Sequence, residues 1–289
     1  MKVDNAVIMA AGTSSRFAPL SYETHKALIE VRGEILIERQ IRQLKEAGVP
    51  EIYIVTGYKA EQFEYLKDKF GIVLIHNPEF QVRNNNSSIF AAKDVICNTF
   101  LCSSDNYFAR NPFEKEVPEA YYAAVYSDGP TSEWCMEADE EGYIRSVTIG
   151  GENAWYMLGH TFWSGEFSRE FLKILDREYD LPATKGKLWE SIFLDHLDTL
   201  KMKIRKYEPD MIFEFDTLDE LRLFDPSYKD DTRSRLLKQC AKELNAGEAD
   251  LVCVRALKNK EGISEGFTFT CKGIPYRFLY REGKAMCLS

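Results

Sequence analysis

The sequence lacks several features that would point to common classes of protein. Its seven cysteines are scattered without a CxxC pair, and its four histidines are isolated from one another. This pattern argues against a disulfide framework and against structural zinc, which needs clustered ligands. The apolar stretch near the N-terminus is short and is broken by Gly12, so neither a signal peptide nor a membrane span is expected. These absences predict a cytoplasmic protein with reduced thiols.

Positive charge is also in short supply. The chain has 37 Lys and Arg residues against 46 Asp and Glu residues, and its formal net charge is −9. Nucleic acid and anionic membrane surfaces would be repelled by this charge, so neither is an expected partner. A small anionic ligand would instead need a local cation, either a few Lys and Arg side chains or a metal ion. No fixed-period repeat and no low-complexity segment is visible.

Short apolar runs alternate with helical patterns through the first half of the chain. Apolar runs typical of buried parallel strands occur at residues 5–10, 51–57, 71–77 and 99–108. Helical spacing occurs between them at 34–47, 61–70 and 87–96. This order predicts an α/β fold with a doubly wound, mainly parallel, Rossmann-like sheet. Later short apolar stretches, separated by Gly and Asp-rich turns, predict an antiparallel extension for binding an acceptor.

The end of the chain differs from the rest in its pattern. A charged helical segment precedes a strand-like run and a hairpin that is expected to turn at Lys272-Gly273. We therefore predict a main domain over residues 1–226 and a small C-terminal appendage over residues 227–289. A segment of about 60 residues is near the lower size limit for an independent core. We interpret it as a lid or a dimerisation element, so a homodimer is compatible with the sequence.

A loop of small residues follows the first predicted strand. Small residues let backbone N–H groups approach a triphosphate, and Arg16 adds a delocalised cation with fixed donor geometry. Lys26 can add a second, point-like charge. An ordinary Gly/Ser turn is the alternative, and the loop is neither a P-loop nor a dinucleotide fingerprint, because the required Lys and glycines are missing. The candidate nucleotide-binding residues of the loop are Ala10, Ala11, Gly12 and Thr13.

The segment AAGTSSR, a following Pro19 and then KALIEV resemble the nucleotide-sugar type nucleotidyltransferases. The usual pattern of that family is LAAGxGxR followed by PKxLxxV. Ser14 stands here in place of the second glycine, and His25 stands in place of the proline before the lysine. The resemblance implies catalytic roles for Arg16 and Lys26, since neither departure removes a phosphate-binding group.

Two acidic residues come at the ends of predicted strands. Asp105 ends the fourth parallel strand, where open α/β sheets bind ligands, and Asp216 ends the run IFEFD. Mg²⁺ prefers one or two carboxylates, with phosphate oxygens and water completing its coordination. Each Asp taken alone is better explained as a turn or cap residue. As a pair placed where the resembled family carries its magnesium aspartates, they predict a Mg²⁺ cofactor.

The middle of the chain resembles a narrower family. The segments NNNSSIFAAKD, SSDNYF, TSEW, LGHTFWS and LWESIF fall in an order similar to that of bacterial CTP:phosphocholine cytidylyltransferases, over about residues 5–225. The resemblance implies that CMP is transferred from CTP to phosphocholine, giving CDP-choline and pyrophosphate. It also implies contacts of Asn85 and Ser88 with the nucleotide, although Asn runs are more often turns and caps.

The trimethylammonium group of phosphocholine limits the kinds of residue that could bind the acceptor. A trimethylammonium group cannot donate a hydrogen bond and is held best by aromatic faces with a nearby carboxylate. For any single aromatic residue a core position is the alternative, and Trp163 fits the core as well as a site. The predicted acceptor-binding residues are Tyr107, Glu133, Trp134, Trp155, Trp189 and Glu190.

Other functions stay open from the sequence. A sugar-1-phosphate nucleotidyltransferase would share the loop and both carboxylates, and a non-catalytic nucleotide-binding regulator would be consistent with Ser14 and His25 as marks of lost chemistry. Phosphoethanolamine as the acceptor and UTP as the nucleotide are equally open. Residues 255–281 faintly resemble the opening hairpin of choline and ethanolamine kinases, with Glu265 where those kinases have Asn, so a remnant or the start of such a domain is a further interpretation of the tail.

Overall fold

The computed structural model describes residues 1–260 and 262–288; residues 261 and 289 of the expected appendage lie outside the described residues. The chain divides into two compact units, each built from two segments. The first unit comprises Met1–Gly12 and Leu36–Glu214, and the second comprises Thr13–Ile35 and the described part of Phe215–Ser289. Residues 13–35 and 215–226 thus group with the tail, whereas the sequence placed them in the main domain. The domain boundary at residue 226 stays a prediction.

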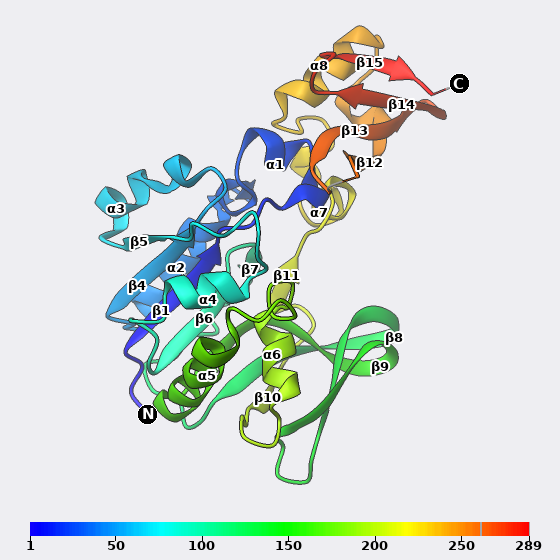
Figure 1. Ribbon diagram of the computed structural model, residues 1–289. Coiled ribbons are helices and arrows are strands. Elements are labelled where there is room, and N and C mark those ends of the chain that lie inside the picture. Colours follow the sequence, from blue (N-terminus) through cyan, green and yellow to red (C-terminus); the bar gives the residue numbers. More distant parts are fainter. Residues whose placement is uncertain (261, 289) are drawn as a thin grey trace. The chain divides into compact units, whose positions relative to one another are not determined.

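A seven-stranded sheet in the order β10-β8-β9-β6-β1-β4-β5 forms the centre of the first unit (Figure 1). Strand β1 is parallel to β4 and β6, and β4 is parallel to β5. The predicted mainly parallel α/β sheet is therefore confirmed. The strand bounds are β1 (Asn5–Ala10), β4 (Glu51–Thr56), β5 (Val73–His76), β6 (Thr99–Ser103), β8 (Tyr121–Ala138), β9 (Ile144–Trp163) and β10 (Lys203–Tyr207).

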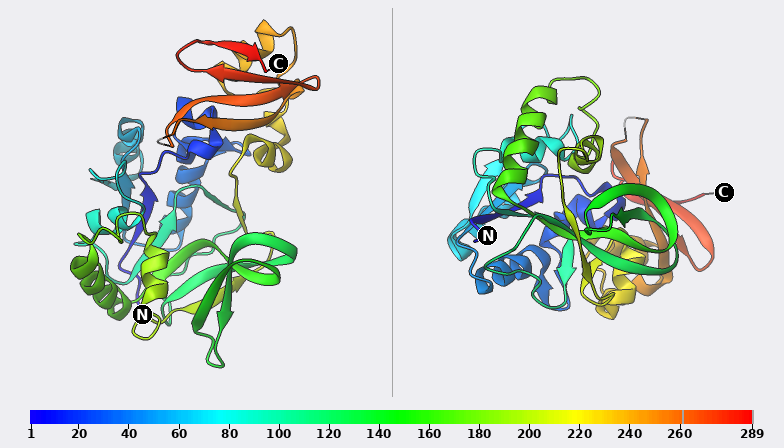
Figure 2. Two further views of the ribbon diagram at one scale, coloured as in Figure 1. Left: turned by 45° about the vertical axis from the view of Figure 1, so that its right-hand side comes forward. Right: turned by 90° about the horizontal axis from the view of Figure 1, so that it is seen from below.

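The predicted antiparallel extension is also confirmed, since β9 runs antiparallel to both β6 and β8. Strands β8 and β9 are 18 and 20 residues long, and their outer parts form a two-stranded ribbon that extends away from the sheet (Figure 2). The sequence predicted two separate short stretches where β9 is continuous. Register shifts between β8 and β9 explain the difference, because each bulge interrupts the two-residue alternation that identifies a strand.

Helices cover both faces of this sheet, as the right-hand view of Figure 2 shows. On strand β1 the neighbouring residues Val7 and Ile8 point to opposite faces, and both are completely buried. No helix among the described residues is both long enough and apolar enough to cross a membrane. The helices of this unit are α2 (Leu36–Glu46), α3 (Tyr65–Phe70), α4 (Asn86–Ala91), α5 (Gly165–Glu178) and α6 (Trp189–Asp195).

A cluster of aromatic rings fills the core beside α5 and α6. Trp163 and Trp189 are fully buried, and their ring centroids lie 5.1 Å apart. Phe171 contacts both indoles, at 4.6 Å from Trp163 and 6.0 Å from Trp189. Trp163 is therefore a core residue, one of the two positions that its sequence pattern allowed.

A four-stranded antiparallel sheet in the order β12-β13-β14-β15 belongs to the second unit. The predicted hairpin is confirmed: Cys271 pairs with Ile274, and Lys272 and Gly273 between them have φ angles of 50° and 80°. A two-residue type I′ turn requires positive φ at both positions. The larger elements here are α1 (Leu20–Glu23), α7 (Leu218–Phe224), α8 (Arg235–Glu243), β12 (Leu251–Lys258), β13 (Ser264–Cys271), β14 (Ile274–Leu279) and β15 (Lys284–Cys287).

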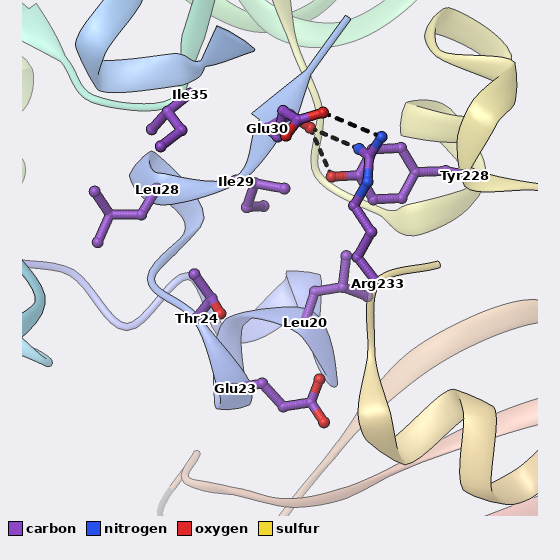
Figure 3. A pocket seen from close by; sticks show the side chains of 9 residues that line it. All are labelled: Leu20, Glu23, Thr24, Leu28, Ile29, Glu30, Ile35, Tyr228 and Arg233. Carbon is purple, nitrogen blue, oxygen red and sulfur yellow. Dashed lines mark hydrogen bonds and ion pairs between the residues drawn. The ribbon is translucent and has the colours of Figure 1, made fainter. Parts of the chain in front are cut away.

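Polar contacts tie the two segments of the second unit together at Glu30, on the short strand β2 (Glu30–Val31). The Tyr228 hydroxyl and the Arg233 guanidinium both donate to the Glu30 carbonyl, at 2.6 and 3.1 Å (Figure 3). Arg233 also lies 3.3 Å from the Glu30 carboxylate and stacks on the Tyr228 ring. These residues border a hollow of about 240 Å³. The tail therefore fixes the strand that follows Lys26 in the chain.

The aromatic core predicts a large cost for removing Trp163. Trp163→Ala is expected to lower the free energy of unfolding by about 3–5 kcal/mol, because it empties a site that neighbouring rings cannot refill. The matched control is Ile149→Ala on the same strand, where the side chain is 70% exposed, and its effect is expected to stay within about 0.5 kcal/mol. Urea unfolding followed by circular dichroism measures both. Equal shifts for the two variants would contradict this assignment of the core.

Candidate active site

The strands β1 and β6 end at the same edge of the sheet, where Met9 and Ser103 are partners in register. After β1, Ala10 and Ala11 are buried, and the Ala11 carbonyl accepts the Tyr58 N–H at 3.0 Å. A Cβ atom at Gly57 would lie only 2.9 Å from the same carbonyl, so glycine is needed there. The backbone that begins the predicted phosphate loop is thus held in a fixed path.

Asp105 lies at this same edge, in the turn between β6 and β7 (Asn106–Phe108). The Ser103 hydroxyl donates to the Asp105 carboxylate at 2.6 Å. Strand β7 pairs with β11 (Ile212–Glu214), and there the Asn106 amide donates to the Glu214 carboxylate at 3.3 Å. The structure therefore places Asp105 at the carboxyl end of a parallel strand, as the sequence predicted.

Three further predicted residues meet within the second unit. The Arg16 guanidinium lies 2.6 Å from the Asp216 carboxylate, and the Lys26 ammonium lies 3.8 Å from it. The Lys26 side chain is only 4% exposed, whereas that of Arg16 is 71% exposed. A buried ammonium needs a nearby anion, whereas an exposed ion pair such as that of Arg16 adds little to stability. Arg16 can therefore change partners at small cost, while Lys26 is fixed in place.

The two departures from the family pattern each have a structural consequence. Ser14 has φ 46° and ψ 42°, a left-handed conformation that glycine adopts without strain. His25 is buried, and its Nδ1 atom accepts the Ala27 N–H at 3.1 Å at the start of the 3-10 helix Lys26–Leu28. Ser14 therefore keeps the backbone path of a glycine, and His25 orients the short helix that carries Lys26.

The two candidate metal ligands belong to different units: Asp105 to the first and Asp216 to the second. The described residues contain no group of three or more His, Cys, Asp or Glu side chains that could hold a metal by themselves. Two carboxylates are nevertheless a suitable donor set for Mg²⁺, which takes its other ligands from phosphates and water. The Mg²⁺ cofactor stays a prediction.

A cavity of about 180 Å³ opens in the first unit near the ends of β1 and β6. Met9 and Ser103 form part of its wall. Its other lining residues include two aromatic residues, two acids and two amides. These are Tyr122, Trp189, Glu190, Glu214, Asn85 and Asn106.

Glu190 is the acid around which this cavity is arranged. Its carboxylate accepts hydrogen bonds from the Asn85 amide at 3.1 Å and from the Tyr122 hydroxyl at 3.3 Å. Tyr122 and Trp189 stack beside it, with ring centroids 5.8 Å apart and planes 14° from parallel. Burial raises the pKa of Glu190 to about 6, although both hydrogen bonds act to lower it. Aromatic faces beside a carboxylate form a suitable environment for a small organic cation.

The structure brings two of the six predicted acceptor residues, Trp189 and Glu190, to this cavity. The ring of Tyr107 is instead covered by the Arg39 guanidinium, at 4.7 Å from the ring centroid. Tyr107 is also buried.

The other three lie on the β8–β9 ribbon, outside the cavity lining. Trp134 and Glu133 belong to β8, and the Lys206 ammonium lies 4.9 Å from the ring centroid of Trp155 on β9. That ring face therefore already holds a cation. The acceptor roles of Tyr107, Glu133, Trp134 and Trp155 stay predictions.

Sequence reasoning missed Tyr122 and Glu214 as cavity residues. Glu214 had a usable signal, because it precedes Asp216 by two residues at the end of a strand. Tyr122 had none: it belongs to a run of apolar strand residues, and only pairing with β9 and packing against Trp189 reveal its position.

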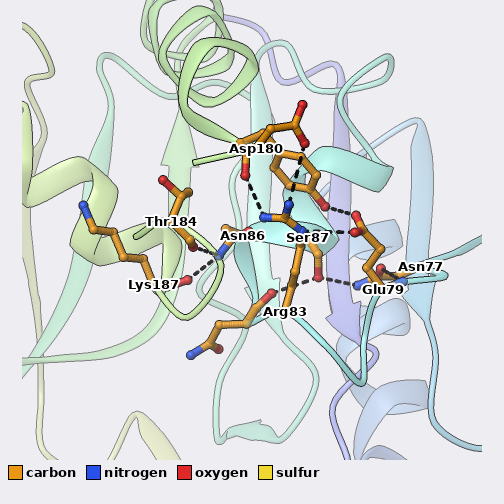
Figure 4. A network of polar contacts seen from close by, with 10 residues as sticks. Asn77, Glu79, Arg83, Asn86, Ser87, Asp180, Thr184 and Lys187 are labelled. Atoms are coloured by element: carbon orange, nitrogen blue, oxygen red, sulfur yellow. Dashed lines mark hydrogen bonds and ion pairs between the residues drawn. The ribbon is translucent and has the colours of Figure 1, made fainter. Parts of the chain in front are cut away.

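A network of polar contacts connects the segment around Asn85 with the segment that precedes α6 (Figure 4). The buried Asn86 amide donates to the carbonyls of Thr184 and Lys187. Arg83 donates to the Tyr179 carbonyl at 2.7 Å and forms an ion pair with Glu79. The network fixes two segments that are about 100 residues apart in the sequence.

The two residues predicted to contact the nucleotide, Asn85 and Ser88, take part in this region of the fold. The Ser88 hydroxyl is buried and lies 3.2 Å from the donating Asn77 amide. The Asn85 oxygen accepts the Trp189 N–H at 2.7 Å. Their contacts with a base or ribose stay predictions.

Comparison with known proteins shows the class to which this fold and site belong. Residues 6–126 match the MobA-like NTP transferase domain. A choline-phosphate cytidylyltransferase of Haemophilus influenzae is 32% identical over 75% of this chain and 94% of its own length. A 2-aminoethylphosphonate cytidylyltransferase of Lancefieldella rimae is 34% identical over 78% of this chain and 93% of its own length. The solved CTP:phosphocholine cytidylyltransferase of Streptococcus pneumoniae has a TM-score of 0.75 at 29% identity, and the match covers 79% of this chain and all of that one.

These matches identify the protein in two steps. The fold and the phosphate loop define a nucleotidyltransferase, with a mostly parallel sheet like that of the pneumococcal structure. Within that class, the chain belongs to the bacterial choline-phosphate cytidylyltransferase family.

The raised pKa of Glu190 predicts a pH-dependent change in stability. An acid whose pKa rises on folding stabilises the fold when it is protonated and loses this contribution as the pH rises through its folded value. A rise from 4.5 to about 6 corresponds to a cost of up to about 2 kcal/mol at neutral pH. Glu190→Gln, which mimics the neutral acid, is expected to raise the free energy of unfolding by up to this amount at pH 8.

Urea unfolding of the wild type and of Glu190→Gln at several pH values measures this effect. The difference between the two proteins is expected to vanish below the ordinary glutamate pKa of about 4.5, where both side chains are neutral. A difference that does not change with pH would show that Glu190 is not the group responsible.

Proposed function

We propose that the protein transfers CMP from CTP to phosphocholine, giving CDP-choline and pyrophosphate. The observation that carries the proposal is the cavity lined by the stacked Tyr122 and Trp189 rings and by the Glu190 carboxylate, within a chain that belongs to this family. A second carboxylate, that of Glu214, lines the same cavity. A sugar phosphate has no cation for these acids to bind, so the cavity supports a cationic acceptor. We also propose a cytoplasmic location, in keeping with the composition.

The acceptor residues would hold the choline group while its phosphate attacks. The aromatic faces contact the methyl groups, and Glu190 supplies the compensating charge without requiring a hydrogen bond from the ligand. A phosphate oxygen of the acceptor then attacks the α-phosphorus of CTP in line, and pyrophosphate leaves. Positioning and charge stabilisation account for most of the catalysis in such transfers, so no nucleophilic Ser or Cys is required.

The cations of the second unit would act on the nucleotide. Arg16 is exposed and is paired only at the surface, so it is suited to move from Asp216 to the β and γ phosphates and stabilise the leaving pyrophosphate. Lys26, fixed by its buried position, would contact the α-phosphate and the incoming phosphate. Both roles neutralise charge that develops during transfer.

The proposal includes Mg²⁺ held by Asp105 and Asp216. A bound magnesium ion would neutralise phosphate charge and orient the triphosphate. The carboxylate of Asp105 is already oriented by the Ser103 hydroxyl, so its direction does not depend on the metal. Backbone N–H groups of the loop Ala10–Thr13 would bind phosphate oxygens.

A second candidate acceptor is 2-aminoethylphosphonate, the substrate named for the relative at 34% identity. It also carries a cation and an anionic phosphorus group at opposite ends. Its primary ammonium group needs hydrogen-bond acceptors, which the carboxylates of Glu190 and Glu214 could provide. The two acceptors therefore differ in whether ring faces or oxygen atoms contribute most of the binding.

A pyrophosphate-release assay decides among these substrates. The four nucleoside triphosphates are tested against phosphocholine, phosphoethanolamine, 2-aminoethylphosphonate and glucose-1-phosphate, with and without Mg²⁺. Release is expected with CTP and phosphocholine, and only with Mg²⁺. A preference for glucose-1-phosphate would reject the proposed acceptor, and absence of release with every pair would indicate a non-catalytic nucleotide-binding protein.

The metal role predicts the effect of changing Asp105. Asp105→Asn keeps the size of the side chain but removes its charge, and kcat is expected to fall by roughly 100-fold or more. The matched control is Asp198→Asn, which makes the same change at an exposed position of the same unit and is expected to retain full activity. Steady-state pyrophosphate release measures kcat, and circular dichroism checks the fold. Near-normal turnover of Asp105→Asn would remove Asp105 from the metal site.

A further inference from the structure

Asn85 makes an unusual pair of hydrogen bonds for a residue at the start of a helix. It occupies the N-cap position of α4 but forms no side-chain hydrogen bond with that helix. An Asn in this position ordinarily accepts an N–H of its own first turn. Here its Oδ1 atom accepts the Trp189 N–H at 2.7 Å, and its Nδ2 atom donates to the Glu190 carboxylate at 3.1 Å. The Asn85 side chain therefore forms hydrogen bonds with the first residues of α6 and none with α4.

The first turn of helix α6 needs a hydrogen-bond acceptor from outside the helix. The first N–H groups of a helix have no acceptor within it, and the N-cap residue of α6 is Leu188, whose side chain cannot accept a hydrogen bond. Asn85 supplies the acceptor for Trp189 from a segment 104 residues away in the sequence. One amide thus caps the helix whose first two residues, Trp189 and Glu190, both line the acceptor cavity.

The chemistry of the amide fixes its direction. A backbone N–H requires an acceptor, so the oxygen of Asn85 must face Trp189. The NH₂ group must then face Glu190, and an NH₂ group can only donate. It therefore favours the carboxylate form of Glu190 over the carboxylic acid.

The surrounding structure prevents Asn85 from moving away from Glu190. Next to it, the Asn86 amide is completely buried and bonded to the carbonyls of Thr184 and Lys187, just before α6 (Figure 4). The segments that carry the donor and the acceptor are thus held together independently of the Asn85 contact. Such support keeps a site residue within the small tolerance that recognition requires.

We propose that Asn85 is a positioning residue that keeps Glu190 ionised and directed into the acceptor cavity, so that a cationic acceptor meets a carboxylate. The proposal rests on the proposed function for the cationic acceptor. It assigns Asn85 to the acceptor side of the site instead of the base. The other groups that face Glu190 are the Tyr122 hydroxyl from β8, which donates to it, and Glu214 from β11, which lines the same cavity.

The test compares kcat/KM for phosphocholine, as a function of pH, in the wild type, Asn85→Asp, Asn85→Ala and Glu190→Gln. Asn85→Asp retains the oxygen that caps α6 but replaces the donor with a second carboxyl group. Two adjacent carboxyl groups share a proton, so Glu190 would be largely neutral at pH 7. Asn85→Ala removes both hydrogen bonds without adding a charge. It therefore shows whether the effect of Asn85→Asp comes from the lost donor or from the new carboxyl group.

In the wild type, kcat/KM for phosphocholine is expected to fall as the pH drops below about 6, because Glu190 then takes up a proton. In Asn85→Asp this fall is expected to begin about two pH units higher, with a loss of about tenfold at pH 7. The KM for CTP is expected to stay within about twofold. The phosphate of phosphocholine also titrates at about pH 6, so each profile is divided by that of Glu190→Gln, which retains only the titration of the substrate. The control Gln81→Glu, which adds the same charge at an exposed position of the same segment, is expected to leave the profile unchanged.

Three results would overturn the proposal. An unchanged pH profile in both Asn85 variants would mean that Asn85 does not act on Glu190. A larger rise in the KM for CTP than in that for phosphocholine would place Asn85 at the base. A wild-type profile identical in shape to that of Glu190→Gln would show that the pH dependence does not come from Glu190.

A measurement without substrate separates this proposal from the proposed function. If the wild type accepts no cationic acceptor, the proposed function fails, but the coupling of Asn85 to Glu190 can still be measured by thermal unfolding. The gain in melting temperature from Glu190→Gln at pH 8 is expected to be larger, by about 2 °C or more, in the Asn85→Ala background than in the wild type. Equal gains in the two backgrounds would overturn the proposal whatever the substrate.

Discussion

The parallel pairing of β1 with β4 and β6 is the constraint from which the site of this protein follows. Parallel strands end at one common edge, so the loop after β1 and the turn after β6 must emerge together. The partner positions of Met9 and Ser103 set the distance between them. Strand β9 pairs along the side of β6 that faces away from β1, and its pairing with β8 brings Tyr122 to the cavity lined by Glu190.

The proposed acceptor cavity combines an acid with aromatic rings, and burying that acid costs stability. Glu190 lies among aromatic rings, and burial raises its pKa. The hydrogen bonds from Asn85 and Tyr122 act in the opposite direction, because they favour the ionised carboxylate. A neutral side chain at this position would be easier to bury but would offer no charge to the acceptor. The cost is limited because the cavity is small and its donors are already in place.

The second unit contains both the proposed phosphate-binding cations and the tail of the chain. Arg16, Lys26 and Asp216 form one charged group, and the tail holds the neighbouring strand through Tyr228 and Arg233. The tail therefore supports the segment that carries Lys26, and its role as a lid or dimerisation element stays a prediction. Whether the protein forms a dimer stays a prediction.

Much of this arrangement could be predicted from the sequence, because the features concerned are local. The apolar run at 5–10, the loop that follows it and the Lys272-Gly273 turn each depend on a few neighbouring residues, and Asp105 follows from its place after a strand. Tyr122, the partner of Asn85 and the covered faces of Tyr107 and Trp155 could not be predicted this way. They depend on contacts between residues that are about 40 to 100 positions apart, and residue type alone cannot tell a ring that packs in the core from one that lines a cavity. Sequence thus determined the class of chemistry and the edge of the sheet where it is expected, whereas the tertiary structure decided which acid and which rings line the cavity there.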